Sequence, residues 1–299
     1  MREQGEGAPL LCKSIAKLKM TVPVSVVIPA LNAERFIGQA IESVHAQTLK
    51  VSEIIVVDNG CTDRTQQMAS ELGANVVVEG QRGLSRARNA GLRQCTQEWI
   101  ALLDSDDLWD AEKMERQWAA AQAYPNAGVV ACYFRVIEDG LVILENTDEV
   151  SEQRWVGYHG RVVGEHCSYF PKIKQDFFPR FLPSCSDALL RRDVFATVGL
   201  FDETVLYNED FEFFMRVLAR YPLAIVEKTL ISCRRHDQKH SFNLQGMRES
   251  VFSIVNYMLQ NPEKYPTGGP QVYRDLLKKN FLTVERALQR QREMGLPVK

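Results

Sequence analysis

Three carboxylates fall within four residues at positions 104–107, which read Asp-Ser-Asp-Asp. These carboxylates repel one another. Because they follow an apolar run that we expect to be a buried strand, their charges would be costly unless a cation offset them. Carboxylate oxygens suit Mg²⁺ or Mn²⁺, and these ions usually share their coordination shell with substrate phosphates. A solvated acidic turn that caps the following helix is the alternative. The four residues alone favour neither, but the preceding strand favours the metal site.

A second polar group, Asp58 and Asn59 followed by Gly60, comes at the end of another apolar run. Its carboxylate and amide can hydrogen-bond a nucleobase or ribose, and Gly60 permits a tight turn. A plain turn with Thr62 or Asp63 as the helix cap explains the same residues. On this segment alone, the plain turn is the favoured interpretation.

Arginines gather at the start of a predicted helix, where Arg82, Arg86 and Arg88 occur within seven residues. Guanidinium groups there could face a diphosphate, and the helix dipole would reinforce the attraction. For any one of these arginines, a solvated helix face is an equally good interpretation.

Two segments of the second half hold groups suited to transfer chemistry. Asp210 precedes an apolar helical pattern, and a carboxylate at a helix start can act as general base towards a hydroxyl. A helix cap is the favoured interpretation of that segment alone. His236 follows Arg234 and Arg235, and imidazole can join a metal shell while arginine neutralises phosphate. Ordinary surface charge is the alternative there.

Short apolar runs alternate with helical patterns through the first half of the chain. Runs that are apolar throughout are typical of a parallel sheet buried on both faces. Ligands collect beyond the carboxyl ends of such strands, so the polar residues that follow each strand should meet at one edge. The predicted strands are 24–28, 53–57, 75–78 and 99–103, and the predicted helices are 33–47, 63–72, 86–95 and 110–124.

The second half of the chain is less regular. Residues 151–183 show no clean period, so we predict a long functional loop there. From residue 247 the pattern is mostly helical, with a break at 262–270. The other predicted elements are a hairpin at 129–136 and 141–144, helices at 192–198 and 208–220, and strands at 223–226 and 229–233.

The composition argues against several classes of protein. The chain has 299 residues and a net charge of -2, which disfavours general binding of nucleic acid. It has no run of about twenty apolar residues, so no transmembrane helix is expected, and residues 1–21 are expected to form a tail. Seven scattered cysteines fit a reducing compartment. We expect a cytoplasmic protein and leave open peripheral association with the inner face of the membrane, as well as the oligomeric state.

Taken in order, these segments resemble family 2 inverting glycosyltransferases. Each motif is weak alone, but the order and spacing of the set are specific, and the resemblance spans roughly residues 22–241. The matching segments are VVIPALN at 26–32, VVDNGCTD at 56–63, ARNAG at 87–91, LDSDD at 103–107, VGLFDE at 198–203, NED at 208–210 and CRRH at 233–236.

The resemblance implies an α/β fold of the GT-A type, with a mostly parallel central sheet flanked by helices. It implies a transferase domain at 22–241, divided into a nucleotide-binding half (22–126) and an acceptor half (127–241), followed by a helical C-terminal extension (242–299). The implied activity moves a sugar from a nucleotide-diphosphate donor to a hydroxyl of a saccharide or lipid-linked acceptor, with Mn²⁺ or Mg²⁺.

The resemblance also assigns roles to single residues. It makes Asp106 the metal-binding residue, with His236 near the metal and diphosphate, and it makes Asp210 the general base. Asp104 would support the ribose or the metal shell. The predicted donor-binding residues are Pro29, Leu31, Asn32, Glu34, Asp58, Asn59, Arg82, Arg88, Asp104 and Ser105.

Three residues depart from the family's usual pattern. Leu31 stands where Tyr is frequent, Asn59 where a second Asp is frequent, and Cys61 where Ser is usual. The change at Asn59 leaves the preference for uridine open. The identities of the donor sugar, the nucleobase and the acceptor are also left open.

Two rival functions differ in class from a glycosyltransferase. A sugar nucleotidyltransferase normally has a glycine-rich basic loop after the first strand, and residues 29–34 do not form such a sequence. A non-catalytic carbohydrate-binding relative is disfavoured because Asp106 and Asp210 are both present.

Overall fold

A computed structural model describes residues 21–145, 161–162, 167–171 and 183–236, together with positions 254, 257, 258, 260 and 261. The predicted tail except Thr21, most of the long loop at 151–183 and nearly all of the predicted C-terminal extension lie outside the described residues. Within the described part of the chain, no helix is long and apolar enough to cross a membrane.

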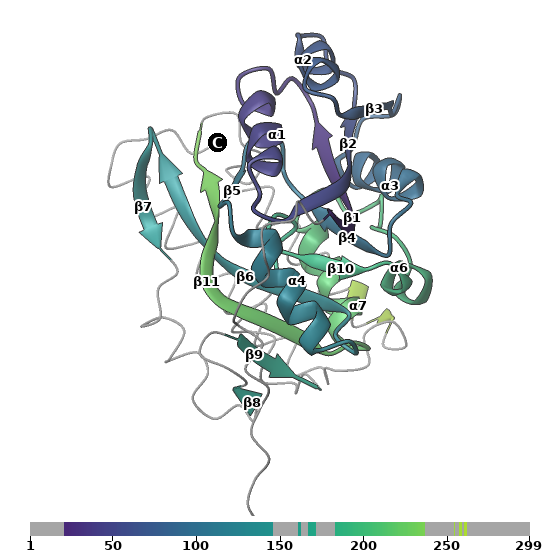
Figure 1. The fold of residues 1–299 in the computed structure, drawn as a ribbon. Helices are drawn as coiled ribbons and strands as arrows, with labels where there is room; N and C mark the ends of the chain where they lie inside the picture. Colours follow the sequence, from purple (N-terminus) through teal and green to yellow (C-terminus); the bar gives the residue numbers. More distant parts are fainter. Residues whose placement is uncertain are drawn as a thin grey trace, which may run out of the picture.

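The centre of the protein is a mixed sheet of eleven strands (Figure 1). Its first half is parallel: β1 (Thr21–Ala30) lies between β2 (Lys50–Asp58) and β4 (Trp99–Leu102), with β3 (Asn75–Val78) beyond β2. Core residues of β1, β2 and β4 are almost fully buried on both faces of the sheet, which explains their continuous apolar runs. The predicted parallel strands are confirmed.

The second half of the sheet mixes both directions. The short strand β10 (Leu189–Arg191) joins the two halves, pairing antiparallel with β4 and with β6 (Val129–Glu138). The long strand β11 (Leu223–Arg234) then runs parallel to β6. The mostly parallel sheet that we expected therefore holds for the first half, while the whole sheet is mixed.

Four further strands surround this second half. The predicted hairpin is confirmed, because β7 (Leu141–Glu145) pairs antiparallel with β6. β5 (Leu108–Trp109) pairs with the far end of β11, so it brings the chain after residue 107 against that strand. β9 (Cys167–Phe170) pairs with the beginning of β11, and β8 (Arg161–Val162) lies beyond β9.

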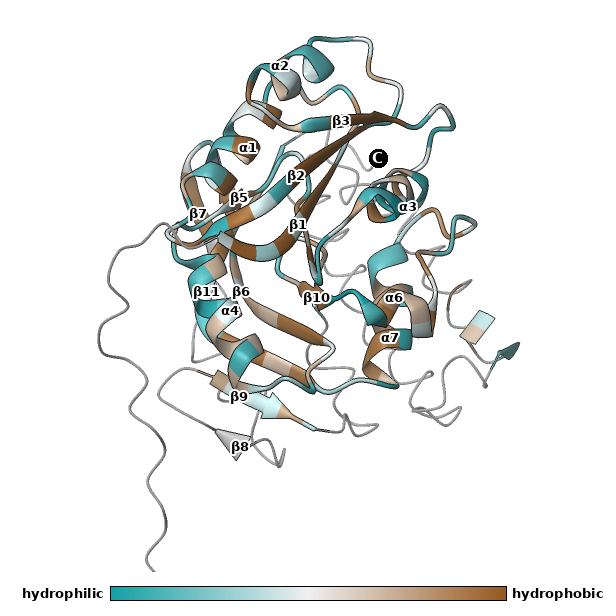
Figure 2. Cartoon of the chain, turned by 45° about the vertical axis from the view of Figure 1, so that its right-hand side comes forward, coloured by the Kyte–Doolittle hydropathy of each residue, from teal (hydrophilic) through white to brown (hydrophobic). Residues whose placement is uncertain are grey.

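Helices cover both faces of the sheet. One face packs against α1 (Ile37–His45), α2 (Thr65–Glu71) and α4 (Lys113–Ala123). The other packs against α3 (Leu84–Gln94), α6 (Asp193–Val198) and α7 (Glu209–Leu218). Figure 2 shows the hydrophobic strands β1, β2 and β3 beside helices that carry hydrophilic residues.

Two predictions for the second half were wrong in detail. The strands expected at 223–226 and 229–233 form the single strand β11, whose register to β6 shifts between Val226 and Ile231. The long loop expected at 151–183 contains β8 and β9, and β9 belongs to the central sheet. These strands have two and four residues, too few to give a readable period.

Candidate active site

One cavity of about 580 Å³ gathers most of the predicted site residues. It lies beyond the carboxyl ends of β1 and β4 and beside the start of α7, where a ligand site was expected. Glu34 and Asp58 are absent from its lining. The predicted residues that line it are Pro29, Leu31, Asn32, Asn59, Arg82, Arg88, Asp104, Ser105, Asp106, Asp210 and His236.

Glu34 and Asp58 instead hold turns near the cavity. The Asp58 Oδ1 atom accepts the backbone N–H groups of Gly60 at 3.0 Å and Cys61 at 2.7 Å. The Glu34 Oε2 atom accepts the backbone N–H of Arg64, next to the start of α2, at 3.1 Å. The plain-turn interpretation of residues 58–63 accounts for the contacts of Asp58. The donor-binding role of Glu34 and Asp58 stays a prediction.

The amide of Asn59 is fully engaged with the backbone. Its Nδ2 atom donates to the carbonyls of Glu79 at 3.1 Å and Gln81 at 2.8 Å, and its Oδ1 accepts the N–H of Gly83 at 2.8 Å. Asn59 is 4% exposed. It therefore holds the loop that brings Arg82 to the cavity, and neither amide hydrogen remains to donate to a base.

The acidic residues at 104–107 face different partners. Asp104 accepts a hydrogen bond from the Arg88 Nη2 atom at 2.8 Å. The Asp106 Oδ2 atom lies 2.8 Å from His236 Nε2. Asp107 is buried and accepts the Ser186 hydroxyl at 2.8 Å. Because α4 begins at Lys113 with Glu112 as its N-cap, the alternative interpretation of residues 104–107 as the cap of the following helix is wrong.

Arg88 joins the loop after β4 to the start of α7. The side chain is 2% exposed, and it forms ion pairs with Asp104 at 2.8 Å and Glu209 at 2.5 Å. The guanidinium was predicted to face a diphosphate, but each terminal nitrogen already donates to a carboxylate. Arg88 therefore fixes the relative position of two acidic segments at the cavity.

Asp210 lines the same cavity and lies in the first turn of α7. Asn208 precedes it with φ of 57°, a left-handed conformation that Asn tolerates better than most residues. Burial, and then the neighbouring carboxylate of Glu209, raise the pKa of Asp210 above the usual range of a carboxyl group. A raised pKa suits a group that accepts a proton near neutral pH.

His236 is held against Asp106 by an aromatic contact. Its ring packs against that of Phe36, with the centroids 4.5 Å apart and the ring planes tilted by 36°. The Nε2 atom faces Asp106, while the Nδ1 atom is buried and has no hydrogen-bond partner among the described residues. The side chains of Asp106 and His236 both line the cavity.

The donor set at Asp106 and His236 fits a divalent cation in part. No group of three or more metal-binding side chains occurs among the described residues. A carboxylate and an imidazole suit Mn²⁺, and Mg²⁺ or Mn²⁺ commonly completes its shell with substrate phosphates and water. The residues present thus fit a cation that arrives with a diphosphate.

Several residues that were not predicted as site residues also shape the cavity. Phe36, Tyr207 and Glu209 line it, and Ser186 supports the loop after β4. Glu209 adjoins Asp210 in the NED segment at 208–210, which resembles the family's motif, so the sequence did indicate its position near the site. Ser186 is a small polar residue with no periodic or motif signal, and only its distant contacts reveal it.

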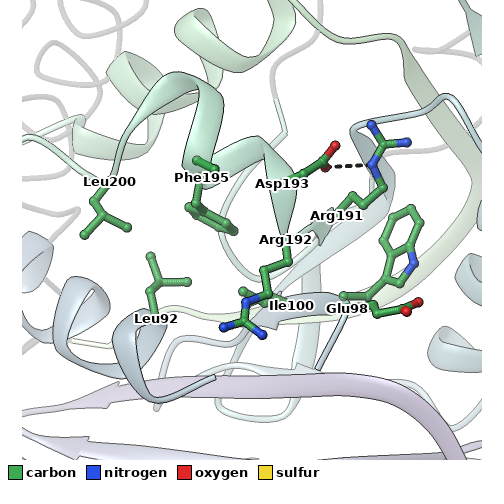
Figure 3. A pocket seen from close by; sticks show the side chains of 10 residues that line it. Leu92, Glu98, Ile100, Arg191, Arg192, Asp193, Phe195 and Leu200 are labelled. Atoms are coloured by element: carbon green, nitrogen blue, oxygen red, sulfur yellow. Dashed lines mark hydrogen bonds and ion pairs between the residues drawn. The ribbon is translucent and has the colours of Figure 1, made fainter. Parts of the chain in front are cut away.

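A second cavity, of about 640 Å³, lies near the amino end of β4 (Figure 3). Its lining is mainly apolar, including Leu92, Phe195 and Leu200, and Arg191 pairs there with Asp193 at 2.7 Å. It contains none of the predicted site residues. The convergent acidic groups make the smaller cavity the better candidate for catalysis.

Comparison with known proteins decides the family. The model of glycosyl transferase family 2 matches residues 25–199, which include the second half of β1, the loop after β4 and β10. The chain belongs to this family. The fold class expected from the resemblance is confirmed.

The relatives agree with this assignment. An uncharacterized glycosyltransferase of Rickettsia typhi is 27% identical over 220 residues, which are 72% of this chain and 64% of that protein. The chain thus spans somewhat under two thirds of the length of that relative.

Two solved structures show the same fold at low identity. S. aureus TarS 1-349, in complex with UDP-GlcNAc, has a TM-score of 0.61 at 19% identity, covering 92% of this chain and 76% of that one. The mannosyltransferase PcManGT from Pyrobaculum calidifontis, in complex with GDP-Man and Mn²⁺, has a TM-score of 0.58 at 17% identity, covering 91% and 75%.

Proposed function

We propose that this family 2 glycosyltransferase transfers a sugar from a nucleotide-diphosphate donor to an acceptor hydroxyl with inversion at the anomeric carbon. The observation that carries the proposal is the placement of Asp210 in the same cavity as Asp106 and His236. The cavity thus holds a group that can accept a proton together with ligands for a cation beside a diphosphate.

The donor side of the cavity is proposed to lie between β1 and the loop after β4. Asp106 and His236 would hold Mn²⁺ or Mg²⁺, which would neutralise the charge of the leaving diphosphate. Leu31, 46% exposed, would contact the base or ribose through its aliphatic side chain, and Arg82 lies on the same lining. Pro29, Asn32 and Ser105 complete this side.

The proposed chemical step is a single displacement. Asp210 takes the proton of the acceptor hydroxyl as the acceptor oxygen forms its bond to the anomeric carbon. The bond from that carbon to the diphosphate oxygen breaks, and the nucleoside diphosphate leaves with the bonding electrons. Attack from the face opposite the diphosphate inverts the configuration.

The substrates are proposed only by class. TarS was solved with UDP-GlcNAc and PcManGT with GDP-Man. This supports a nucleotide-sugar donor and leaves open which nucleobase the donor of this chain carries. We propose a saccharide or lipid-linked acceptor that enters beside Tyr207 and Asp210. The division into donor and acceptor halves at residue 126, like the cytoplasmic location with peripheral membrane contact, stays a prediction.

The test is a screen of nucleotide sugars with and without Mn²⁺. Thermal shifts would identify the donor, and product analysis would then follow its turnover. The proposal predicts release of the nucleoside diphosphate and transfer of the sugar. Release of pyrophosphate during sugar activation would support a nucleotidyltransferase, and binding without turnover of any donor would support a non-catalytic relative.

A further inference from the structure

The loop that carries Asp104 and Asp106 rests on one buried serine, Ser186, which precedes β10. The Ser186 hydroxyl accepts the backbone N–H of Asp104 at 3.1 Å and donates to Asp107 Oδ2 at 2.8 Å. The Ser186 carbonyl accepts the indole N–H of Trp109 at 3.1 Å. These three bonds reach both ends of the loop, although Ser186 lies about eighty positions further along the chain.

Asp107 also contacts the segment that carries His236. Its second oxygen, Oδ1, accepts the backbone N–H of Arg234 at 3.2 Å, at the end of β11. The Arg234 guanidinium in turn donates to the carbonyl of Asp106 at 3.2 Å. Asp107 is 2% exposed, so solvent does not replace these partners.

The bridge from Ser186 through Asp107 therefore joins the two segments whose side chains face each other across 2.8 Å, Asp106 and His236. Two ligands on different segments bind one cation well only if the distance between them is set before the ion arrives. A small shift of the loop would change that distance, although the side chains of Asp106 and His236 themselves remain.

We propose that Ser186 is a positioning residue for the donor-phosphate metal site: through Asp107 it sets Asp106 against His236. The inference rests on the proposed function of Asp106 and His236. Ser186 is absent from the lining of the cavity, so its effect would run through the loop rather than through contact with substrate.

The test removes the hydroxyl with Ser186→Ala. A thermal-shift panel of UDP, GDP, ADP, CDP and dTDP first selects the nucleotide that the parent binds with Mn²⁺. Calorimetry then measures Mn²⁺ affinity at saturating nucleotide. Loss of a hydrogen-bond partner of a metal ligand typically weakens metal affinity about 10- to 100-fold. Because Ser186 acts through Asp107, we expect a loss at the lower end, about 10-fold. Nucleotide affinity without Mn²⁺ should stay at the parent value.

Ser25→Ala is the matched control. Ser25 is also fully buried, and its hydroxyl likewise accepts a backbone N–H, from Gln97 at 3.2 Å, and donates to a carboxylate, that of Glu53. It lies in β1 away from the cavity lining. The control should lose thermal stability to a similar degree and keep the parent's Mn²⁺ affinity, which separates positioning from general destabilisation.

A second variant covers the case in which Ser186→Ala does not fold. Asp107→Ala removes both oxygens, so neither the Ser186 hydroxyl nor the Arg234 N–H keeps its carboxylate partner. It should show the same loss of Mn²⁺ affinity. Parent-like Mn²⁺ affinity in a folded variant of either kind would overturn the positioning role.

Asp106→Ala separates the two levels of failure. If Asp106→Ala loses Mn²⁺ affinity while Ser186→Ala keeps it, the positioning role is wrong and the proposed function stands. If Asp106→Ala also binds Mn²⁺ as the parent does, or if the parent binds none of the nucleotides, the proposed metal site is wrong and the inference about Ser186 is overturned with it.

Discussion

At the scale of single residues, Asn59 shows how a residue type can mislead. An amide after a strand end was a reasonable candidate for reading a nucleobase. In the folded chain its two hydrogens and its oxygen bind the backbone of Glu79, Gln81 and Gly83. The amide thus shapes the cavity through the loop that carries Arg82, and no local sequence pattern reveals these contacts.

Asn59→Asp should weaken nucleotide binding, even though aspartate is frequent at this position in the family. A carboxylate cannot donate to the carbonyls of Glu79 and Gln81, and each buried carbonyl left without a partner costs about 1–3 kcal/mol. We expect a lower melting temperature and a weaker nucleoside-diphosphate affinity by calorimetry. Cys61→Ser, the neighbouring departure from the family, should change neither. Parent-like stability and affinity in Asn59→Asp would contradict the loop-holding role.

At the scale of elements, the sequence predicted the first half of the fold well and the second half less well. Strands β1, β2 and β4 are buried on both faces, so their apolar runs identify them directly. The short strands β5 and β10 have two and three residues, and only their pairing with β11, β4 and β6 defines them.

The candidate site shows the same division between local and distant information. Asp106, Asp210 and His236 follow or begin predictable elements, so the sequence placed them near one cavity. The partners of Arg88 and Ser186 lie far along the chain, 121 positions away for Glu209 and 79 for Asp107. Such contacts depend on how the elements pack, which neither residue type nor spacing encodes.

The packing of α3 on the sheet depends on Gly91. A Cβ atom there would lie 2.3 Å from Val27 Cγ1 and 3.0 Å from Val57 Cγ2, on two central strands. Gly91→Ala should therefore destabilise the protein by about 1–3 kcal/mol through overpacking. Denaturant unfolding measures this change. Gly80→Ala is the control, because nothing lies within 4 Å of its Cβ. Equal stability of the two variants would show that α3 moves away without cost.

At the scale of the whole molecule, the two proposed halves share one sheet and one buried ion-pair cluster. Strand β10 joins the sheet across the proposed boundary, and Arg88 links Asp104 of the donor half to Glu209 of the acceptor half. This arrangement would set the distance between the donor diphosphate and the proposed base. Stability and catalysis should therefore depend on the same contact.

Arg88→Met should destabilise the whole chain. It leaves the buried carboxylate of Glu209 without its cation, and removing one partner of a buried ion pair costs about 3–5 kcal/mol. Denaturant unfolding should show a clear loss, and turnover should fall with it. Arg64→Met breaks an exposed pair with Glu34 and should cost about 0–1 kcal/mol. A loss in Arg88→Met no larger than in that control would contradict the linking role.

The proposed reaction depends most directly on Asp210, so the decisive measurement is the turnover of the Asp210→Asn variant with the donor that the parent uses. Removal of a general base typically slows a reaction about 10²- to 10⁴-fold. The account predicts a loss of that order in nucleoside-diphosphate release during sugar transfer, with donor affinity by calorimetry unchanged. Transfer by the purified, folded variant at the parent rate would contradict it.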